Sequence, residues 1–313
     1  MKFCPSILDE VATKIRNKNL LHEHSIILGD NASGKSELIR RIVKEKIDKG
    51  ERVYFIDSVN RYFDVSKIDG LTSSIEIERN IILKRLTNEY FNTKDSFSMY
   101  GTETDCIEMF YMRYKNAVQE LLKEFNQLTF EVTFPKEKLV RYSEEAEGKL
   151  SNGIQALVRI FVELVYLQEV TDSNQIMVVI DEVDEYLSPS NAGKILSFLI
   201  MKFPHMQFVV STHSADLVCS TKNCNLVIIQ KDYYEVTDSN DFESMGEVQF
   251  MFEKIFSESR EQKTVRIEEQ LRRLINNKMM GAWGKKDEET LQEIEESLLT
   301  NAQKILYKRI KEW

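Results

Sequence analysis

A glycine-bounded segment near the N-terminus constrains the fold of this chain more than any other feature. The apolar residues Ile26–Leu28 lead into Gly29–Ser36, whose spacing is Gly, four residues, Gly, Lys and Ser. This spacing is typical of a phosphate-binding loop that connects a strand to a helix. Residues 35–48 carry apolar side chains at helical intervals, so the flanking helix is predicted as well. A chance match of the spacing is the alternative, and the flanking strand and helix argue against it.

The residue types in this segment suit phosphate binding. Successive backbone N–H groups of the loop and the N-terminus of the following helix face the phosphates. Lys35 supplies a positive charge, and Ser36 offers its hydroxyl to Mg²⁺. The candidate phosphate-binding residues are Gly29, Asn31, Ser33, Gly34, Lys35 and Ser36.

Alternating strand and helix patterns extend this segment into an α/β fold with a parallel core sheet. Further strands are predicted at residues 52–57, 176–180, 207–211 and 226–229, and helices at residues 6–19, 35–48 and 191–203. We interpret residues 226–229 as the last core strand. Two polar segments, Asp181-Glu182 and Thr212-His213-Ser214, come directly after strands, where open α/β sheets bind their ligands.

The chain departs from this alternation in two regions. Residues 64–126 are mainly helical and polar enough to form a lobe inserted into the core, and residues 128–134 and 139–142 predict a hairpin that returns to the sheet. Residues 144–148 are interpreted as a flexible acidic turn before an apolar helix. Residues 247–313 have a helical pattern with mixed charge.

Composition and charge exclude several classes of function. The formal charge of −9 argues against a polyanion-binding surface over the whole molecule, although a local basic patch is compatible with nucleic-acid binding. The N-terminus lacks the apolar core of a signal peptide, and no stretch reaches the roughly 18 to 20 apolar residues of a membrane span. We therefore expect a cytoplasmic protein that does not associate with membranes.

The four cysteines have neither the density of a disulfide scaffold nor paired CxxC spacing. Cys219 and Cys224 are interpreted as reduced structural thiols, because disulfides are rare in the cytoplasm. A metal shared between these two cysteines and a histidine is the alternative.

Four segments, taken in order, resemble the ATP-binding-cassette (ABC) class of P-loop ATPases: Gly29–Ser36, Leu150–Gln155, Ile176–Glu182 and His213. Within that class, the resemblance is to the soluble branch that includes the SMC proteins and the overcoming-lysogenisation-defect (OLD) ATPases. It covers roughly residues 24 to 230. It implies a P-loop NTPase fold in which helices flank a parallel core sheet. Together with the patterns above, the resemblance predicts an ABC-type ATPase domain at residues 1–240, with an inserted, mainly helical lobe at about 64–148, and a helical C-terminal extension at 241–313.

The resemblance implies roles for the polar residues after the strands. Asp181 matches the Walker B aspartate, which holds Mg²⁺ beside Ser36, and Glu182 matches the catalytic glutamate that polarises the attacking water. His213 resembles the switch histidine that contacts the γ-phosphate of ATP, and Lys35 completes the catalytic set. For the acids and for His213, the alternatives are ordinary turn residues and a hydrogen-bonded structural histidine.

Ser151 and Gly153 match the signature motif, which in this class contacts the γ-phosphate bound to the opposite subunit. Hydrolysis would then need two copies of the chain, so we expect a homodimer or a higher even-numbered oligomer. The alternative for Ser151 is an ordinary N-cap, because serine before an apolar helix is favoured there in any case.

Three departures from the class pattern are informative. No glutamine precedes Gln119, so the usual glutamine loop is missing, and Asn60 and Arg61 are either its substitutes or a solvated loop pair. No residue is identified that would hold the adenine base. Asp238 and Asp241 are a poor match for the acidic cluster of the OLD nuclease domain, so we expect no intrinsic nuclease.

These observations favour an ATP- and Mg²⁺-dependent ATPase that dimerises around ATP. We expect it to control a separate effector, a nuclease or a toxin, in anti-phage defence or DNA repair. One alternative is the nucleotide-binding subunit of a transporter. Another is an SMC-like DNA clamp with a basic stripe formed by Arg260, Lys263, Arg266, Arg272, Arg273 and Lys278.

Overall fold

The chain folds into two compact units, Met1–Gln249 and Phe250–Trp313, which are described separately. The computed structural model describes residues 5–30, 33–58, 61–68, 96, 107–132, 140–143, 146–171, 175–230, 233–242, 244–257, 270–271, 273–275, 277–278, 283–294, 299 and 301–312. The functional division into residues 1–240 and 241–313 stays a prediction.

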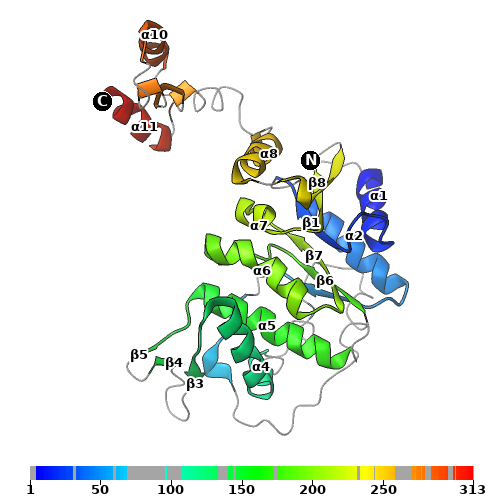
Figure 1. The fold of residues 1–313 in the computed structure, drawn as a ribbon. Coiled ribbons are helices and arrows are strands. Elements are labelled where there is room, and N and C mark those ends of the chain that lie inside the picture. The colour runs from blue at the N-terminus through cyan, green and yellow to red at the C-terminus, as the bar shows by residue number, and fades with distance from the viewer. Residues whose placement is uncertain are drawn as a thin grey trace. The chain divides into compact units, whose positions relative to one another are not determined.

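A six-stranded sheet forms the centre of the first unit (Figure 1). Its strands are, in spatial order, β2 (Val53–Ile56), β6 (Ile176–Ile180), β7 (Met206–Ser211), β1 (His24–Leu28), β8 (Cys224–Ile229) and β9 (Tyr234–Asp238). The first five run parallel, and β9 runs antiparallel to β8. The predicted α/β class, with a mainly parallel sheet flanked by helices, is confirmed.

The interpretation of residues 226–229 as the last core strand is wrong, because β9 follows and pairs with β8 along its whole length. The side chains of β9 are only partly buried, and its residues Tyr234–Asp238 are largely polar. An edge strand of this kind is held by its backbone pairing and carries little of the apolar pattern by which strands are predicted.

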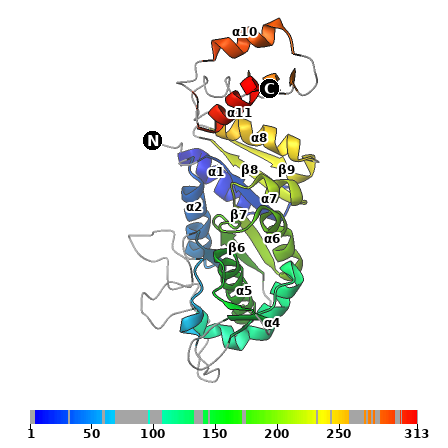
Figure 2. The ribbon, with the colours of Figure 1, turned by 90° about the vertical axis from the view of Figure 1, so that its left-hand side faces the viewer.

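Helices cover both faces of this sheet (Figures 1 and 2). On one face, α1 (Pro5–Arg16) and α2 (Lys35–Asp48) pack against alternate strand residues such as Phe55, Val179 and Val209. On the other face lie α5 (Asn152–Val170), α6 (Pro189–Lys202) and α7 (Ala215–Ser220). Because β-strand side chains alternate between faces, two separate apolar layers insulate the sheet from water.

The region between β2 and α5 is described in part. Its main element is α4 (Glu108–Asn126), which packs on α5 through ring contacts that include Phe125 with Phe161, 6.1 Å between centroids. A short 3₁₀ helix, η1, spans Val65–Lys67. The helical pattern at residues 75–93 lies outside the described residues, so the inserted lobe as a whole stays a prediction.

A small antiparallel sheet precedes α5. It consists of β3 (Glu131–Val132), β4 (Val140–Ser143) and β5 (Ala146–Gly148). The predicted pairing of the two segments is confirmed, but they belong to this separate sheet and not to the core sheet. The interpretation of residues 144–148 as a flexible turn is wrong for residues 146–148. These residues pair with β4 through backbone hydrogen bonds, which need no apolar side-chain pattern.

The second unit is helical where it is described. A helix, α8 (Met245–Ser257), begins in the first unit and ends in the second, and α10 (Lys285–Glu293) and α11 (Asn301–Glu312) follow. A small core holds this unit together through Leu271, Leu274, Leu291, Ile294, Leu299, Tyr307 and Ile310. None of the helices in the described part of the chain combines the length and the apolar character that crossing a bilayer requires.

Candidate nucleotide-binding site

The glycine-bounded loop connects β1 to α2, as the motif requires. Lys35, the first residue of α2, folds back so that its Nζ donates to the carbonyl oxygens of Gly29 at 2.8 Å and Asp30 at 3.1 Å. Burial lowers the pKa of Lys35, and the carboxylates of Glu182 and Asp181 oppose this shift. A buried ammonium group held beside carboxylates is suited to an anionic ligand that replaces or supplements its carbonyl partners.

Two glycines are needed by the geometry of this loop. A Cβ atom at Gly29 would lie 2.7 Å from the carbonyl oxygen of Ile229 and 2.4 Å from Oγ of Ser33. Gly34 has a φ of 110°, a conformation that side-chain-bearing residues rarely adopt. Ser33 is buried between them, whereas Ser36 is exposed in the first turn of α2. Asn31 lies outside the described residues.

The two acids follow β6 in a turn that is anchored on the neighbouring strands. The N–H of Asp181 donates to the carbonyl oxygen of Ile56 in β2 at 3.0 Å, and the N–H of Val183 donates to that of Ser211 in β7 at 3.1 Å. Glu182 has a φ of 47°, which is uncommon for any residue except glycine. This conformation ends the strand alternation, so two adjacent carboxylates can lie on the same side of the sheet.

His213 follows β7 on the same edge of the sheet. Its Nε2 atom lies 3.7 Å from Oε1 of Glu182. Burial and the charge of Lys35 lower the pKa of His213, whereas burial and the charge of Asp181 raise the pKa of Glu182. The structure therefore brings Lys35, Asp181, Glu182 and His213 together at the carboxyl ends of β1, β6 and β7, where ligands bind in open α/β sheets.

The contacts that the structure describes for Ser151 and Gly153 do not involve this cluster. Ser151 is exposed and caps α5, its Oγ accepting from the N–H of Ile154 at 3.4 Å, so the N-cap interpretation describes its contact within one chain. A Cβ atom at Gly153 would lie 2.8 Å from the carbonyl oxygen of Tyr186, in the turn after Glu182. Within the described ranges, no hydrogen bond or ion pair joins Ser151 or Gly153 to the four clustered residues.

Two further buried residues, Ser211 and Arg61, contact the turn that carries the two acids. The Oγ of Ser211 donates to Oδ1 of Asp181 at 2.5 Å and accepts from the N–H of Glu182 at 2.8 Å. Arg61 is only 2% exposed, and its Nη2 donates to the carbonyl oxygen of Asp181 at 2.7 Å. The solvated-loop interpretation of Arg61 is therefore wrong, while Asn60 lies outside the described residues. Ser211 is a polar residue at the end of the apolar strand β7, and this position was the only indication of its role in the sequence.

The donor set fits a hard divalent cation. The exposed hydroxyl of Ser36 and the carboxylate of Asp181 are oxygen donors of the kind that Mg²⁺ prefers, and Mg²⁺ completes its shell with water and phosphate oxygens. Among the residues that the structure describes, no group of three or more His, Cys, Asp or Glu side chains forms a separate metal site. Cys219 and Cys224 are free thiols, and burial raises the pKa of Cys224 to about 12.

Replacing Ser211 by alanine tests how the turn is held. Without the hydroxyl, the Glu182 N–H loses its acceptor and the Asp181 carboxylate its donor, so we expect a loss of about 1 to 3 kcal/mol of stability. Under the ATPase function that is proposed below, turnover should also fall by about 10- to 100-fold, as is usual when a partner that orients a metal ligand is removed. Urea unfolding and a phosphate-release assay measure the two effects.

The matched control is Ser239→Ala, which removes an equally buried hydroxyl that accepts from the Cys224 N–H at 3.0 Å. This variant should lose stability but keep its turnover. Equal loss of turnover in both variants would show that Ser211 acts only through global stability.

Comparison with solved structures returns ATP-binding cassettes and SMC head domains. An ATP-binding cassette of an ABC transporter in its ADP conformation matches at 15% identity over 75% of this chain and 86% of that chain, with a TM-score of 0.41. A nucleotide-free cassette from an ABC transporter matches at 17% identity over 69% and 80%, with a TM-score of 0.39. The SMC head domain from Thermotoga maritima matches at 22% identity over 42% of this chain and less than half, 49%, of that chain, with a TM-score of 0.32.

No protein-family model matches the sequence, and a search of curated proteins gives no match either. Because every reported identity is below 25% and every TM-score below 0.5, a functional assignment has to rest on the geometry of the site.

Proposed function

We propose that the chain is an ATPase that binds ATP with Mg²⁺ on the loop between β1 and α2. The observation that carries this proposal is the convergence of Lys35, Asp181, Glu182 and His213 at the carboxyl ends of three adjacent parallel strands. One buried cation, two carboxylates and a histidine beside this loop match the needs of phosphoryl transfer to water.

Each residue has a distinct task in this proposal. Lys35 binds the terminal phosphates, for which its bonds to the Gly29 and Asp30 carbonyls are exchanged or shared. Glu182 orients and deprotonates the attacking water. His213, whose lowered pKa keeps it neutral at pH 7, donates one N–H to the γ-phosphate.

Ser36 and Asp181 are the residues that would hold Mg²⁺. The ion, when bound, neutralises charge on the phosphate oxygens. Ser211 and Arg61 act as positioning residues, because they hold the side chain and the backbone carbonyl of Asp181, respectively.

The active form in this proposal is a dimer in which each copy completes the other's site. Ser151 and Asn152 are exposed at the N-terminus of α5, where the helix dipole and free N–H groups favour an anion, and no bond ties Ser151 to its own cluster. We further propose that the ATP-bound dimer controls a separate effector, a nuclease or a toxin, in anti-phage defence or DNA repair. Of the basic stripe, only Arg273 and Lys278 lie among the described residues, so a DNA clamp stays an untested alternative.

A complementation experiment tests the composite site. We expect no turnover from either single variant, Lys35→Ala or Ser151→Arg, because a homodimer of one variant carries the substitution in both of its sites. Mixing the two variants should restore activity, since a mixed dimer has one intact site. If dimers form at random and sites act independently, the mixture should reach about a quarter of the wild-type rate.

Steady-state phosphate release measures this result, with tagged copies purified from co-expression to confirm mixed dimers. If the Ser151→Arg variant were fully active alone, Ser151 would not be part of the catalytic site. Absence of recovery in verified mixed dimers would contradict the composite arrangement while leaving ATP binding by the loop intact.

A further inference from the structure

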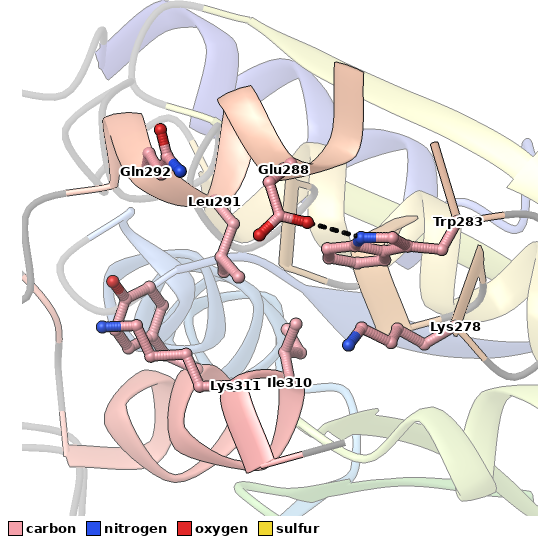
Figure 3. Close-up of a pocket in the computed structure, with 8 residues that line it drawn as sticks. Lys278, Trp283, Glu288, Leu291, Gln292, Ile310 and Lys311 are labelled. Atoms are coloured by element: carbon pink, nitrogen blue, oxygen red, sulfur yellow. Dashed lines mark hydrogen bonds between the residues drawn. The ribbon is translucent and has the colours of Figure 1, made fainter. Parts of the chain in front are cut away.

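The second unit contains a cavity of about 360 Å³ whose lining includes none of the residues proposed for catalysis (Figure 3). Its centre is apolar, formed by Leu291 of α10 and Ile310 of α11, which are 7% and 0% exposed. This volume is at the lower end of the roughly 300 to 1,000 Å³ that ligand pockets occupy. The cavity is therefore large enough for a small group or for one anchoring side chain.

Two lysines line the cavity, and each lies over an aromatic ring. The Nζ of Lys278 is 4.4 Å from the ring centroid of Trp283, and the Nζ of Lys311 is 4.7 Å from that of Tyr307. In Figure 3 the two lysines lie on opposite sides of Leu291 and Ile310. Within the described part of this unit, neither ammonium group is paired with a carboxylate.

Among the lining residues, the acidic side chain of Glu288 forms no ion pair with either lysine. The Glu288 carboxylate accepts a hydrogen bond from Nε1 of Trp283 at 2.9 Å, which directs it to the indole edge (Figure 3). The cavity thus offers an apolar centre between two cations, and its natural complement is apolar in the middle and negatively charged on both sides.

This arrangement favours a peptide over a nucleic acid. Bases bind single-strand sites by stacking on open aromatic faces. Here each ring already has an ammonium group on one face, and Tyr307 is only 5% exposed. An acidic peptide, in contrast, needs no open ring face, because it can place its carboxylates at the two lysines and an apolar side chain between them.

We propose that this cavity binds an acidic peptide segment of a partner protein, with one apolar side chain against Leu291 and flanking carboxylates at Lys278 and Lys311. This site would give the chain a means of recognising a partner that does not depend on the proposed ATPase. The peptide-binding proposal can therefore be tested independently of nucleotide binding.

The first test uses Trp283 as the reporter. The full chain has two tryptophans, so Trp313→Phe leaves Trp283 alone. The probe is the acetylated and amidated peptide Asp-Glu-Phe-Glu-Asp, which should change the Trp283 fluorescence with saturation. The neutral peptide Asn-Gln-Phe-Gln-Asn and the anchorless peptide Asp-Glu-Gly-Glu-Asp should each bind about tenfold more weakly or less. Equal binding of the neutral peptide would overturn the proposal.

The second test uses variants and isothermal titration calorimetry with the same peptide. Lys278→Gln and Lys311→Gln should each weaken binding by about two- to fivefold, the usual range for an exposed charge pair. Lys308→Gln, an exposed lysine of α11 outside the cavity lining, is the matched control and should bind as the wild type does. Unchanged affinity in both cavity variants, or displacement of the peptide by an oligothymidylate, would overturn the proposal. ATP turnover should be the same in all three variants.

Discussion

Replacing Glu182 by glutamine is expected to lower ATP turnover by about a hundredfold or more while leaving ATP bound. The amide has the shape of the carboxylate but cannot accept the proton of the attacking water. The turn itself should persist, because it is held by backbone and Ser211 contacts that the substitution leaves in place. This variant should therefore lose ATP turnover but keep ATP binding.

The environment of Glu182 predicts a second effect of the same substitution. Burial and the neighbouring Asp181 raise the pKa of Glu182, so keeping it ionised costs free energy in the native state. Glutamine removes this cost and the repulsion between the two acids. We therefore expect the variant to retain ATP at least as tightly as the wild type, and to accumulate as an ATP-bound dimer.

Single-turnover hydrolysis and light scattering after size-exclusion chromatography, each with and without ATP and Mg²⁺, measure these two effects. Lys35→Ala should lose binding and dimer formation together, and Glu235→Gln, an exposed acid of β9, should behave as the wild type. A Glu182→Gln variant that turns over within about fivefold of the wild-type rate would show that Glu182 is not the base.

The long apolar elements of the fold could be predicted from the sequence, and the short polar ones could not. The helix at residues 35–48 has the predicted bounds, because the Gly34 conformation opens it and an apolar stripe fixes its inner face. In contrast, β5, α7 and β9 have 3, 6 and 5 residues. The equally short strands β2 and β6 were predicted, because each is a continuous apolar run. Without such a run, a short element is stabilised by pairing and packing with distant segments, which local patterns do not encode.

Some residues of the candidate site could likewise be predicted from the sequence, and others could not. Lys35, Asp181, Glu182 and His213 could be proposed because each follows or begins an element with a strong pattern. Their supporting residues could not, because the role of Ser211 depends on the pairing of β7 beside β6. The sequence also could not distinguish a helix cap from a ligand contact for Ser151, since one hydroxyl is suited to both.

Stability of the first unit should depend strongly on a charged pair in its core. Arg159 and Glu163 interrupt the most apolar helix, α5, and are 4% and 0% exposed. The Arg159 Nε lies 3.0 Å from Oε1 of Glu163, and the Tyr54 hydroxyl of β2 donates to Oε2 of Glu163 at 2.9 Å. The pair thus joins the helix to the sheet beneath it.

Removing one partner of this pair should be far more costly than removing both. In Glu163→Leu, the buried Arg159 guanidinium loses its ion pair with Glu163, and we expect a loss of about 3 to 5 kcal/mol. The double variant Arg159→Met with Glu163→Leu should recover most of this loss, because well-packed apolar side chains of similar volume often replace a buried ion pair at little cost. The Tyr54 hydroxyl then still loses the hydrogen bond that it donates to Glu163, so adding Tyr54→Phe should recover a further part.

Urea unfolding followed by hydrogen exchange of peptides from α5 and β6 reports this unit alone. Lys18→Met is the matched surface control, since its 2.9 Å pair with Glu23 joins side chains that are 43% and 40% exposed, and its loss should be below about 1 kcal/mol. If Glu163→Leu cost no more than this control, the pair would contribute nothing as a unit. If the double variant were no better than the single one, the loss would come from packing of α5 rather than from an uncompensated charge.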